Sequence, residues 1–178
     1  VVGNVFLLAA GYDIGRPSAR LIDDLGYRGE IERARDLLKT YRDRILMPHS
    51  VAVREDGGRA EYPVDAVPED AQVLDIGSES IDRLTEAVSA SGTVVVNGPA
   101  GLFEEEQFAV GTFDLLRAAS TVKFSVVGGG HSGAAIERLG IEDRFTHIST
   151  GGGAAIEFLT GKKMPALEAL EMSKKIFG

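Results

Sequence analysis

Short apolar runs alternate along the chain with longer segments of helical spacing. Residues 73–76, 93–96 and 124–127 are rich in valine, isoleucine and leucine, which is typical of strands buried in a parallel sheet. Residues 81–90 and 105–119 are expected to form the helices between these strands, because apolar side chains recur along one face. Strands that alternate with helices over short links predict an α/β fold of three αβα layers around a Rossmann-like parallel sheet.

The first part of the chain has a different pattern. The expected elements are helices over residues 5–10, 18–25 and 30–41, a strand over residues 44–48, and a hairpin of residues 49–53 and 59–64. Pro48 should stop the strand. The first helix looks like one whose preceding strand is absent.

Three of the expected strands in the second half are followed by glycine-rich segments. Residues 98–101 contain two glycines, and residues 128–130 and 151–153 are glycine throughout. Glycine allows positive φ angles and lets a ligand approach the backbone, and a helix N-terminus presents unpaired N–H groups to an anion. Because the ends of parallel strands share one edge, we predict a single site there for a phosphate-bearing ligand.

Each segment also has a purely structural interpretation. Asn97-Gly98 is a turn signal in any context, and residues 151–153 alone would fit a flexible link. His131 stands at the start of a helix, where packing and hydrogen bonding to phosphate are both compatible with the sequence. His49 and His147 match no metal-binding spacing, so a structural role is favoured for both.

The glycine pattern invites comparison with two well-known nucleotide motifs. Gly128-x-Gly130-x-x-Gly133 matches the dinucleotide fingerprint, but the acidic residue expected at the end of the next strand is replaced by Ile148-Ser149-Thr150. A nicotinamide oxidoreductase is therefore disfavoured, and the Walker phosphate-binding loop is absent. Glu104 directly follows the first glycine turn, where its carboxylate could reach the hydroxyl pair of a ribose.

Composition narrows the class of protein. A length of 178 residues is enough for one domain with a core, and the absence of cysteine rules out disulfides and thiol chemistry within the chain. The net charge of −8 argues against a nucleic-acid partner. No apolar stretch is long enough to span a membrane and no secretory signal opens the chain, so a cytoplasmic protein is expected.

In order and spacing, the three glycine motifs resemble those of phosphoglycerate kinase. The resemblance is carried by residues 94–104, 127–132 and 147–154, with weaker agreement at residues 74–77, 108–112 and 158–165. It implies that residues 1–178 are the nucleotide-binding, C-terminal domain of a two-domain kinase, incomplete at its N-terminal end. That enzyme transfers a phosphoryl group between 1,3-bisphosphoglycerate and Mg-ADP in glycolysis and gluconeogenesis.

The resemblance also implies roles for individual residues. Catalytic roles fall to Gly130, Gly151, Gly152 and Gly153, and nucleotide binding to Leu74, Gly77, Asn97, Gly98, Pro99, Glu104, Gly128, Gly129, Gly130, His131 and Ser132. Leu74 and Gly77 would wall the adenine, and Glu104 would bind the ribose hydroxyls. Mg2+ would accompany ATP or ADP, through protein ligands that the sequence does not identify.

Two substitutions and one missing region depart from the family pattern. His131 replaces the aspartate that most often binds the nucleotide's magnesium, which is typical of the archaeal branch, and Ser50 stands where many members have aspartate. The N-terminal domain that binds 3-phosphoglycerate or 1,3-bisphosphoglycerate is missing, so the chain alone is expected to be inactive. The full-length enzyme is expected to be a monomer. The alternative is a non-catalytic nucleotide-binding lobe that regulates a partner chain.

Overall fold

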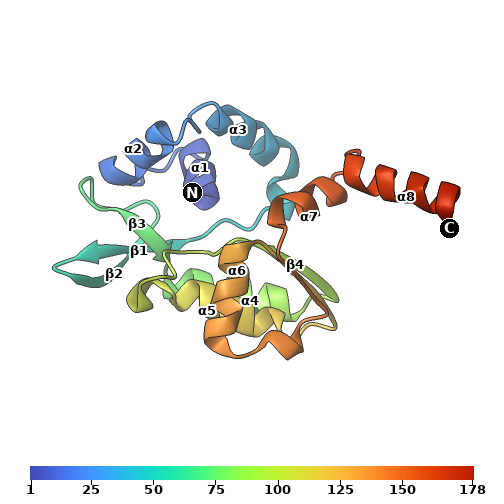
Figure 1. The fold of residues 1–178 in the computed structure, drawn as a ribbon. Helices are drawn as coiled ribbons and strands as arrows, with labels where there is room; N and C mark the ends of the chain where they lie inside the picture. The colour runs from blue at the N-terminus through green and yellow to red at the C-terminus, as the bar shows by residue number, and fades with distance from the viewer.

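The computed structural model describes residues 1–178 and contains two separate three-stranded sheets, one antiparallel and one parallel (Figure 1). The helices are α1 (Val2–Ala9), α2 (Arg16–Asp24), α3 (Glu30–Tyr41), α4 (Ser78–Ser89), α5 (Val110–Ala119), α6 (Gly130–Leu139), α7 (Gly152–Leu159) and α8 (Pro165–Phe177). The strands are β1 (Ser50–Glu55), β2 (Gly58–Pro63), β3 (Val73–Ile76), β4 (Thr93–Asn97), β5 (Phe124–Gly128) and β6 (His147–Ser149). Three 3-10 turns complete the set, η1 (Arg42–Arg44), η2 (Glu106–Phe108) and η3 (Glu142–Arg144).

Helices α1, α2 and α3 form a small helical layer with its own core. Val5, Ala9, Ile22, Ala34 and Leu38 are buried together between these helices. Since full burial of a side chain the size of Ile22 stabilises the fold by about 1.5–3 kcal/mol, this cluster is sufficient to hold three short helices against one another. The predicted helices of the first 41 residues are confirmed.

The antiparallel sheet has the order β2-β1-β3. Its hairpin is confirmed: β1 and β2 pair with Glu55 opposite Gly58, and the turn places Asp56 and Gly57 at φ angles of 48° and 80°. Strand β3 exists as predicted, but it pairs antiparallel with β1 and not with the parallel sheet. β3 therefore does not continue the expected parallel alternation, because its pairing partner is the antiparallel strand β1, with Val51 opposite Ile76 and Ala52 opposite Asp75.

The predicted strand at residues 44–48 is wrong. This segment is partly the turn η1 and otherwise has no regular structure, and the side chain of Leu46 is 56% exposed. A strand is defined by its pairing with a neighbour, and no other strand pairs with these residues.

The parallel sheet has the order β4-β5-β6 and supports the core of the second half of the chain. Leu116 of α5 and Ala135 and Ile136 of α6 form a cluster with Val127 of β5, and all four are almost fully buried. Val96, Phe113, Leu139, Phe145 and Ile148 extend this cluster. The α/β class with a parallel sheet flanked by helices is confirmed.

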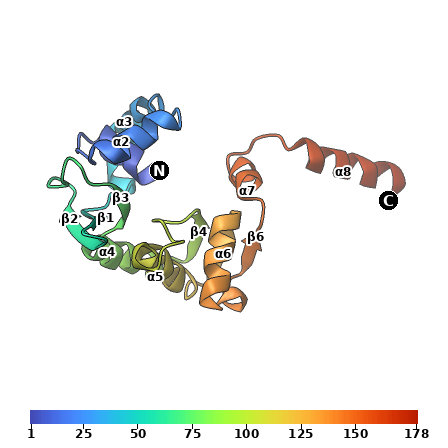
Figure 2. The same cartoon turned by 60° about the vertical axis from the view of Figure 1, so that its left-hand side comes forward.

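The last two helices lie at the surface. No residue of α7 or α8 is buried, and α8 extends away from the rest of the molecule in both ribbon views (Figure 2). Helix α7 ends before Gly161, which has a φ angle of 70°, as predicted for a helix-terminating glycine. None of the helices combines the length and apolar character needed to cross a membrane.

Candidate functional site

The three glycine-rich segments meet at one edge of the parallel sheet. Asn97 at the end of β4 lies opposite Gly128 at the end of β5, which lies opposite Ser149 at the end of β6. Two hydrogen bonds link the segments that follow: Gly98 N–H donates to Ser132 Oγ at 2.9 Å, and Gly129 N–H donates to the Ser149 carbonyl at 3.1 Å. The expected convergence of these motifs is therefore present in the fold.

Close backbone packing explains two of the glycines. A Cβ atom on Gly152 would lie 2.6 Å from Gly129 Cα and 3.0 Å from Asn97 Oδ1, and one on Gly128 would lie 2.9 Å from Asn97 Oδ1. Gly129 also has a φ angle of 98°, which a residue with a side chain rarely adopts. The first turn of α7 can thus pack directly against the β5–α6 turn.

Two helices begin at this edge without side-chain caps. Gly129 precedes α6 and Gly151 precedes α7, and neither helix start receives a side-chain hydrogen bond at its cap. The first N–H groups of both helices consequently remain available to an acceptor. An anion such as a phosphate is the acceptor that a helix N-terminus favours.

The turn after β4 connects this edge with the end of β3. Leu102 N–H donates to the Leu74 carbonyl at 2.7 Å, and Thr112 Oγ1 accepts from the N–H groups of Ala100 and Gly101 at 3.0 and 3.3 Å. Glu104, at the end of the turn, is exposed and has no hydrogen-bond or ion-pair partner.

The remaining predicted residues occupy the same region with different surroundings. Gly77 precedes α4 and donates its N–H to the Ser50 carbonyl at 2.9 Å, whereas Pro99 is exposed in the turn after β4 and Gly153 is exposed in the first turn of α7. Gly130 begins α6 and Gly151 precedes α7. A Cβ on Gly130 would meet nothing within 4 Å and one on Gly151 only Ala154 Cβ at 3.7 Å, so close packing explains neither glycine.

His131 is an exposed residue in the first turn of α6. Its ring lies edge-on to the ring of Phe103, with the centroids 6.2 Å apart. Arg138 fixes the same loop by donating to the Phe103 carbonyl at 2.6 Å. A packing role for His131 is therefore visible, and its contact with phosphate stays a prediction.

Ser50 is part of a buried hydroxyl pair. The Oγ atoms of Ser50 and Ser80 lie 3.2 Å apart, and Ser80 Oγ also donates to the Ser50 carbonyl. A Cβ on Gly77 would come within 2.5 Å of Ser50 Oγ. Ser50 thus helps to hold the start of α4 against the start of β1.

Sequence reasoning did not identify the buried charges behind the turn. Asp75 accepts hydrogen bonds from the N–H groups of Gly111 and Ile76, and Arg59 pairs with it at 2.9 Å. Burial raises the pKa of the Asp75 carboxyl, although the Gly111 N–H and Arg59 act in the opposite direction. The only signal in the sequence was an acidic residue inside an apolar strand, since its partners are distant along the chain.

The site contains no preformed cage for a metal ion. No group of three histidine, aspartate or glutamate side chains is arranged to hold one. Mg2+ prefers oxygen ligands and commonly binds through substrate phosphates with few protein ligands. Asn97 Oδ1 and Ser132 Oγ are side-chain oxygens at this edge, a ligand type compatible with a magnesium ion that arrives with a nucleotide.

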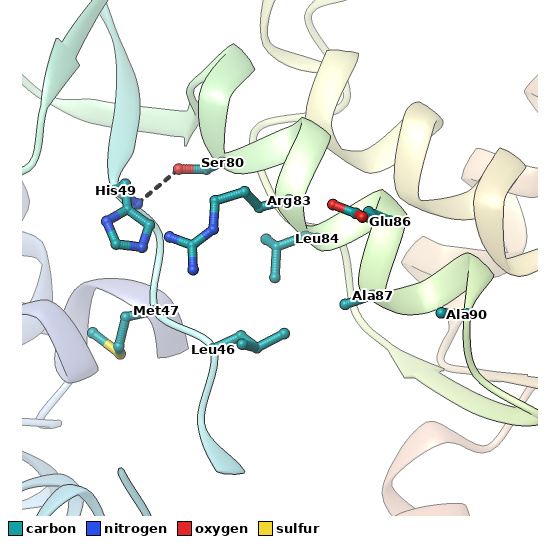
Figure 3. A pocket seen from close by; sticks show the side chains of 9 residues that line it. All are labelled: Leu46, Met47, His49, Ser80, Arg83, Leu84, Glu86, Ala87 and Ala90. Atoms are coloured by element: carbon teal, nitrogen blue, oxygen red, sulfur yellow. Dashed lines mark hydrogen bonds between the residues drawn. The ribbon is translucent and has the colours of Figure 1, made fainter. Parts of the chain in front are cut away.

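Two hollows of the surface lie outside the glycine-lined edge. One, of about 350 Å3, separates residues 46–49 from α4 (Figure 3), and there the His49 N–H donates to Ser80 Oγ at 2.8 Å. The other, of about 560 Å3, is mostly apolar and lies between α1 and α3. Neither is lined by any residue predicted for nucleotide binding.

Comparison with known proteins gives consistent matches. The family model for phosphoglycerate kinase matches residues 1–162. The chain is 57% identical over 178 residues to the phosphoglycerate kinase of Methanocorpusculum labreanum, of which it covers 44%, and 46% identical over 171 residues (96% of the chain) to that of Methanopyrus kandleri, of which it covers 42%. It therefore spans less than half the length of these curated relatives.

Solved structures give the same result. The crystal structure of phosphoglycerate kinase from Pyrococcus horikoshii OT3 superposes with a TM-score of 0.90 at 38% identity, over 99% of this chain and 44% of that one. The structure from Coxiella burnetii gives a TM-score of 0.81 at 31% identity, over 94% of this chain and 44% of that one. The archaeal matches fit the archaeal character expected from the sequence.

Proposed function

We propose that this chain, which belongs to the phosphoglycerate kinase family, is the nucleotide-binding lobe of such a kinase and takes Mg-ADP or Mg-ATP. The observation that carries the proposal is the convergence of three glycine-rich strand ends with the uncapped starts of α6 and α7. A net charge of −8 repels phosphates at long range. Local backbone N–H groups are therefore the natural means of holding them.

The proposed nucleotide lies along the turn after β4. Its adenine contacts Leu74 and Gly77, and its ribose hydroxyls donate to the Glu104 carboxylate. Its phosphates lie over residues 97–99 and 128–132. This placement is supported by the hydrogen bond between Leu102 and Leu74, which holds the adenine side close to the turn that carries Glu104.

The proposed reaction is transfer of a phosphoryl group between 1,3-bisphosphoglycerate and ADP, as part of glycolysis and gluconeogenesis in the cytoplasm. Catalysis of this kind consists mainly of positioning and charge stabilisation. Gly130 and residues 151–153 would supply N–H groups to the transferred group from two helix starts, and magnesium bound with the nucleotide would neutralise part of its charge. The acyl phosphate would be held by the portion of the relatives that this chain does not span.

Titration calorimetry of the 178-residue chain tests the proposal. Mg-ADP should bind, and Mg-ATP should compete with it, whereas NAD should not bind. A flat trace with millimolar Mg-ADP, or a preference for NAD, would overturn the proposed site.

A further inference from the structure

The Asp75 carboxylate lies where three segments of the chain meet. It is 2% exposed. Its Oδ1 accepts from the Ile76 N–H at 2.9 Å, and its Oδ2 accepts from the Gly111 N–H at 2.9 Å. A Cβ atom on Gly101 would lie 2.6 Å from Asp75 Cγ, and one on Gly111 would lie 3.2 Å from it. The carboxylate therefore fills the space between two glycines that no larger residue could occupy.

Arg59 holds this carboxylate from the β2 side. The Arg59 side chain is 15% exposed and donates to Asp75 Oδ2 at 2.9 Å, to the Gln107 carbonyl at 3.0 Å and to the Ile76 carbonyl at 2.8 Å. Its Nε donates to Glu61 at 2.9 Å. One guanidinium thus joins β2, the end of β3 and η2, and its planar fork suits several acceptors at once.

The segments that Asp75 joins are those that carry the proposed adenine and ribose contacts. Leu74 precedes Asp75 in β3, Gly77 lies between β3 and α4, and Gly101 belongs to the turn that leads to Glu104. Gly111 precedes Thr112, whose hydroxyl receives the N–H groups of that turn. A shift of the Asp75 carboxylate would change the distance between the proposed adenine contacts, Leu74 and Gly77, and the turn that carries Glu104.

We propose that Asp75, oriented by Arg59, is a positioning residue that fixes the adenine side of the nucleotide site against the turn bearing Glu104. This inference rests on the proposed nucleotide site, and Asp75 acts without touching the ligand. A buried ion pair is by itself weak evidence of stabilisation. Two backbone N–H groups and the Arg59 guanidinium donate to this one carboxylate, which lies between Gly101 and Gly111. These contacts indicate instead that the arrangement of the three segments around Asp75 is fixed.

The test compares ligands that use different parts of the site. Asp75→Asn keeps the shape but turns one acceptor oxygen into a donor, which faces either the Ile76 N–H or the Gly111 N–H and Arg59 together. Calorimetry should show adenosine and Mg-ADP binding about tenfold more weakly. Magnesium pyrophosphate should bind unchanged, because the phosphate edge is held separately by the Gly98–Ser132 and Gly129–Ser149 hydrogen bonds.

Two further variants keep the result interpretable. Asp114→Asn makes the same chemical change at a partly exposed residue of α5 paired with Arg117, and it should alter none of the three affinities. Arg59→Lys retains the charge but cannot reach all of its acceptors. It should give an intermediate loss for adenosine, and it replaces Asp75→Asn as the decisive variant if the latter does not fold.

The pH profile adds a readout that a merely structural role would not change. Burial raises the Asp75 pKa above its ordinary value of 3.8, and Arg59 is the charged group in contact with it, with Glu61 beyond. As the pH falls towards that raised pKa, adenosine affinity should decline in the wild type more steeply than in Asp75→Asn.

The outcomes separate the two proposals. If the wild type binds neither Mg-ADP nor adenosine, the proposed function fails. The inference is overturned if the wild type binds both ligands but Asp75→Asn lowers the affinity for adenosine, Mg-ADP and magnesium pyrophosphate by the same factor. It is also overturned if Asp75→Asn leaves all three affinities unchanged. In either case Asp75 has only a structural role.

Discussion

Gly152 and Gly153 are adjacent glycines with very different surroundings. A Cβ on Gly152 would meet the Gly129 backbone at 2.6 Å, whereas one on Gly153 would meet nothing within 4 Å. Gly152→Ala should therefore destabilise the chain by about 1–3 kcal/mol through overpacking against backbone that cannot move aside. It should also abolish detectable Mg-ADP binding.

Gly153→Ala is the matched control for that substitution. Alanine stabilises a helix relative to glycine by about 1 kcal/mol, and Gly153 lies inside the first turn of α7. The Gly153→Ala variant should therefore be as stable as the wild type or slightly more stable. Urea denaturation measures the free energy of unfolding of both variants and of the wild type. Equal stability of the two variants would show that the start of α7 does not pack on the β5–α6 turn.

Glu104 is the residue most directly linked to the proposed ribose contact. Because its carboxylate is exposed and has no protein partner, Glu104→Ala should leave folding intact. Mg-ADP affinity should weaken by about 1–2 kcal/mol through loss of hydrogen bonds to a charged acceptor. Glu106→Ala, also exposed, should bind Mg-ADP as the wild type does; an unchanged affinity in Glu104→Ala would make Glu104 a surface residue only.

Helix α4 offers a prediction about acid stability. Glu61 of β2 accepts from the Ser78 N–H at 2.7 Å and from the Ser78 hydroxyl, so a carboxylate lies at the helix N-terminus. Burial alone would raise the Glu61 pKa, but the hydrogen bonds from Ser78 and the contact with Arg59 lower it overall. The ionised carboxylate therefore stabilises the fold above pH 4.5, and this stabilisation is lost as the pH falls through the lowered pKa.

Glu61→Gln should thus cost about 0.5 kcal/mol at neutral pH, as expected for a charge at a helix N-terminus. The difference from the wild type should shrink steadily once the pH drops below about 4.5. Thermal melts between pH 7 and pH 3 check this, with Glu171→Gln on exposed α8 as the control. A difference in melting temperature that stays constant over this range would contradict the assigned role of Glu61.

The sequence predicted elements that neighbouring residues along the chain determine. It did not predict elements that depend on pairing with a distant segment. The β1–β2 hairpin was predictable because Asp56-Gly57 supplies the positive φ angles of its turn. The convergence at Asn97, Gly128 and Ser149 follows from parallel pairing. Residues 44–48 have strand-like composition but no neighbouring strand.

The buried charges illustrate a second limit. Asp75 contacts Arg59 and Gly111 across 16 and 36 positions of sequence, and nothing in the spacing of these residues signals their contact. The meeting of the three glycine-rich strand ends could therefore be predicted from glycine patterns, whereas the contacts of Asp75 with Arg59 and Gly111 required the fold.

At the scale of the whole molecule, apolar surface is distributed unevenly. Val95 on the edge strand β4 is 45% exposed, and Leu170 and Phe177 of α8 are 66% and 85% exposed. Large exposed apolar surfaces often mark sites where another part of a protein or a partner packs. The curated relatives are more than twice as long as this chain, and we expect the corresponding surfaces to be covered in those longer proteins.

The same comparison of length leads to a prediction about activity. Phosphoryl transfer requires the acyl phosphate and the nucleotide to be held in line at close range, and the chain spans 44% of the Methanocorpusculum relative. The purified 178-residue chain should therefore bind Mg-ADP but form no ATP from 1,3-bisphosphoglycerate in a coupled assay. The full-length Pyrococcus horikoshii enzyme serves as the positive control, and calorimetry on the same sample shows whether the nucleotide site is intact. Turnover above the rate without protein would mean that this chain itself holds the phosphoglycerate, and the division of the two substrates between separate parts of the enzyme would have to be abandoned.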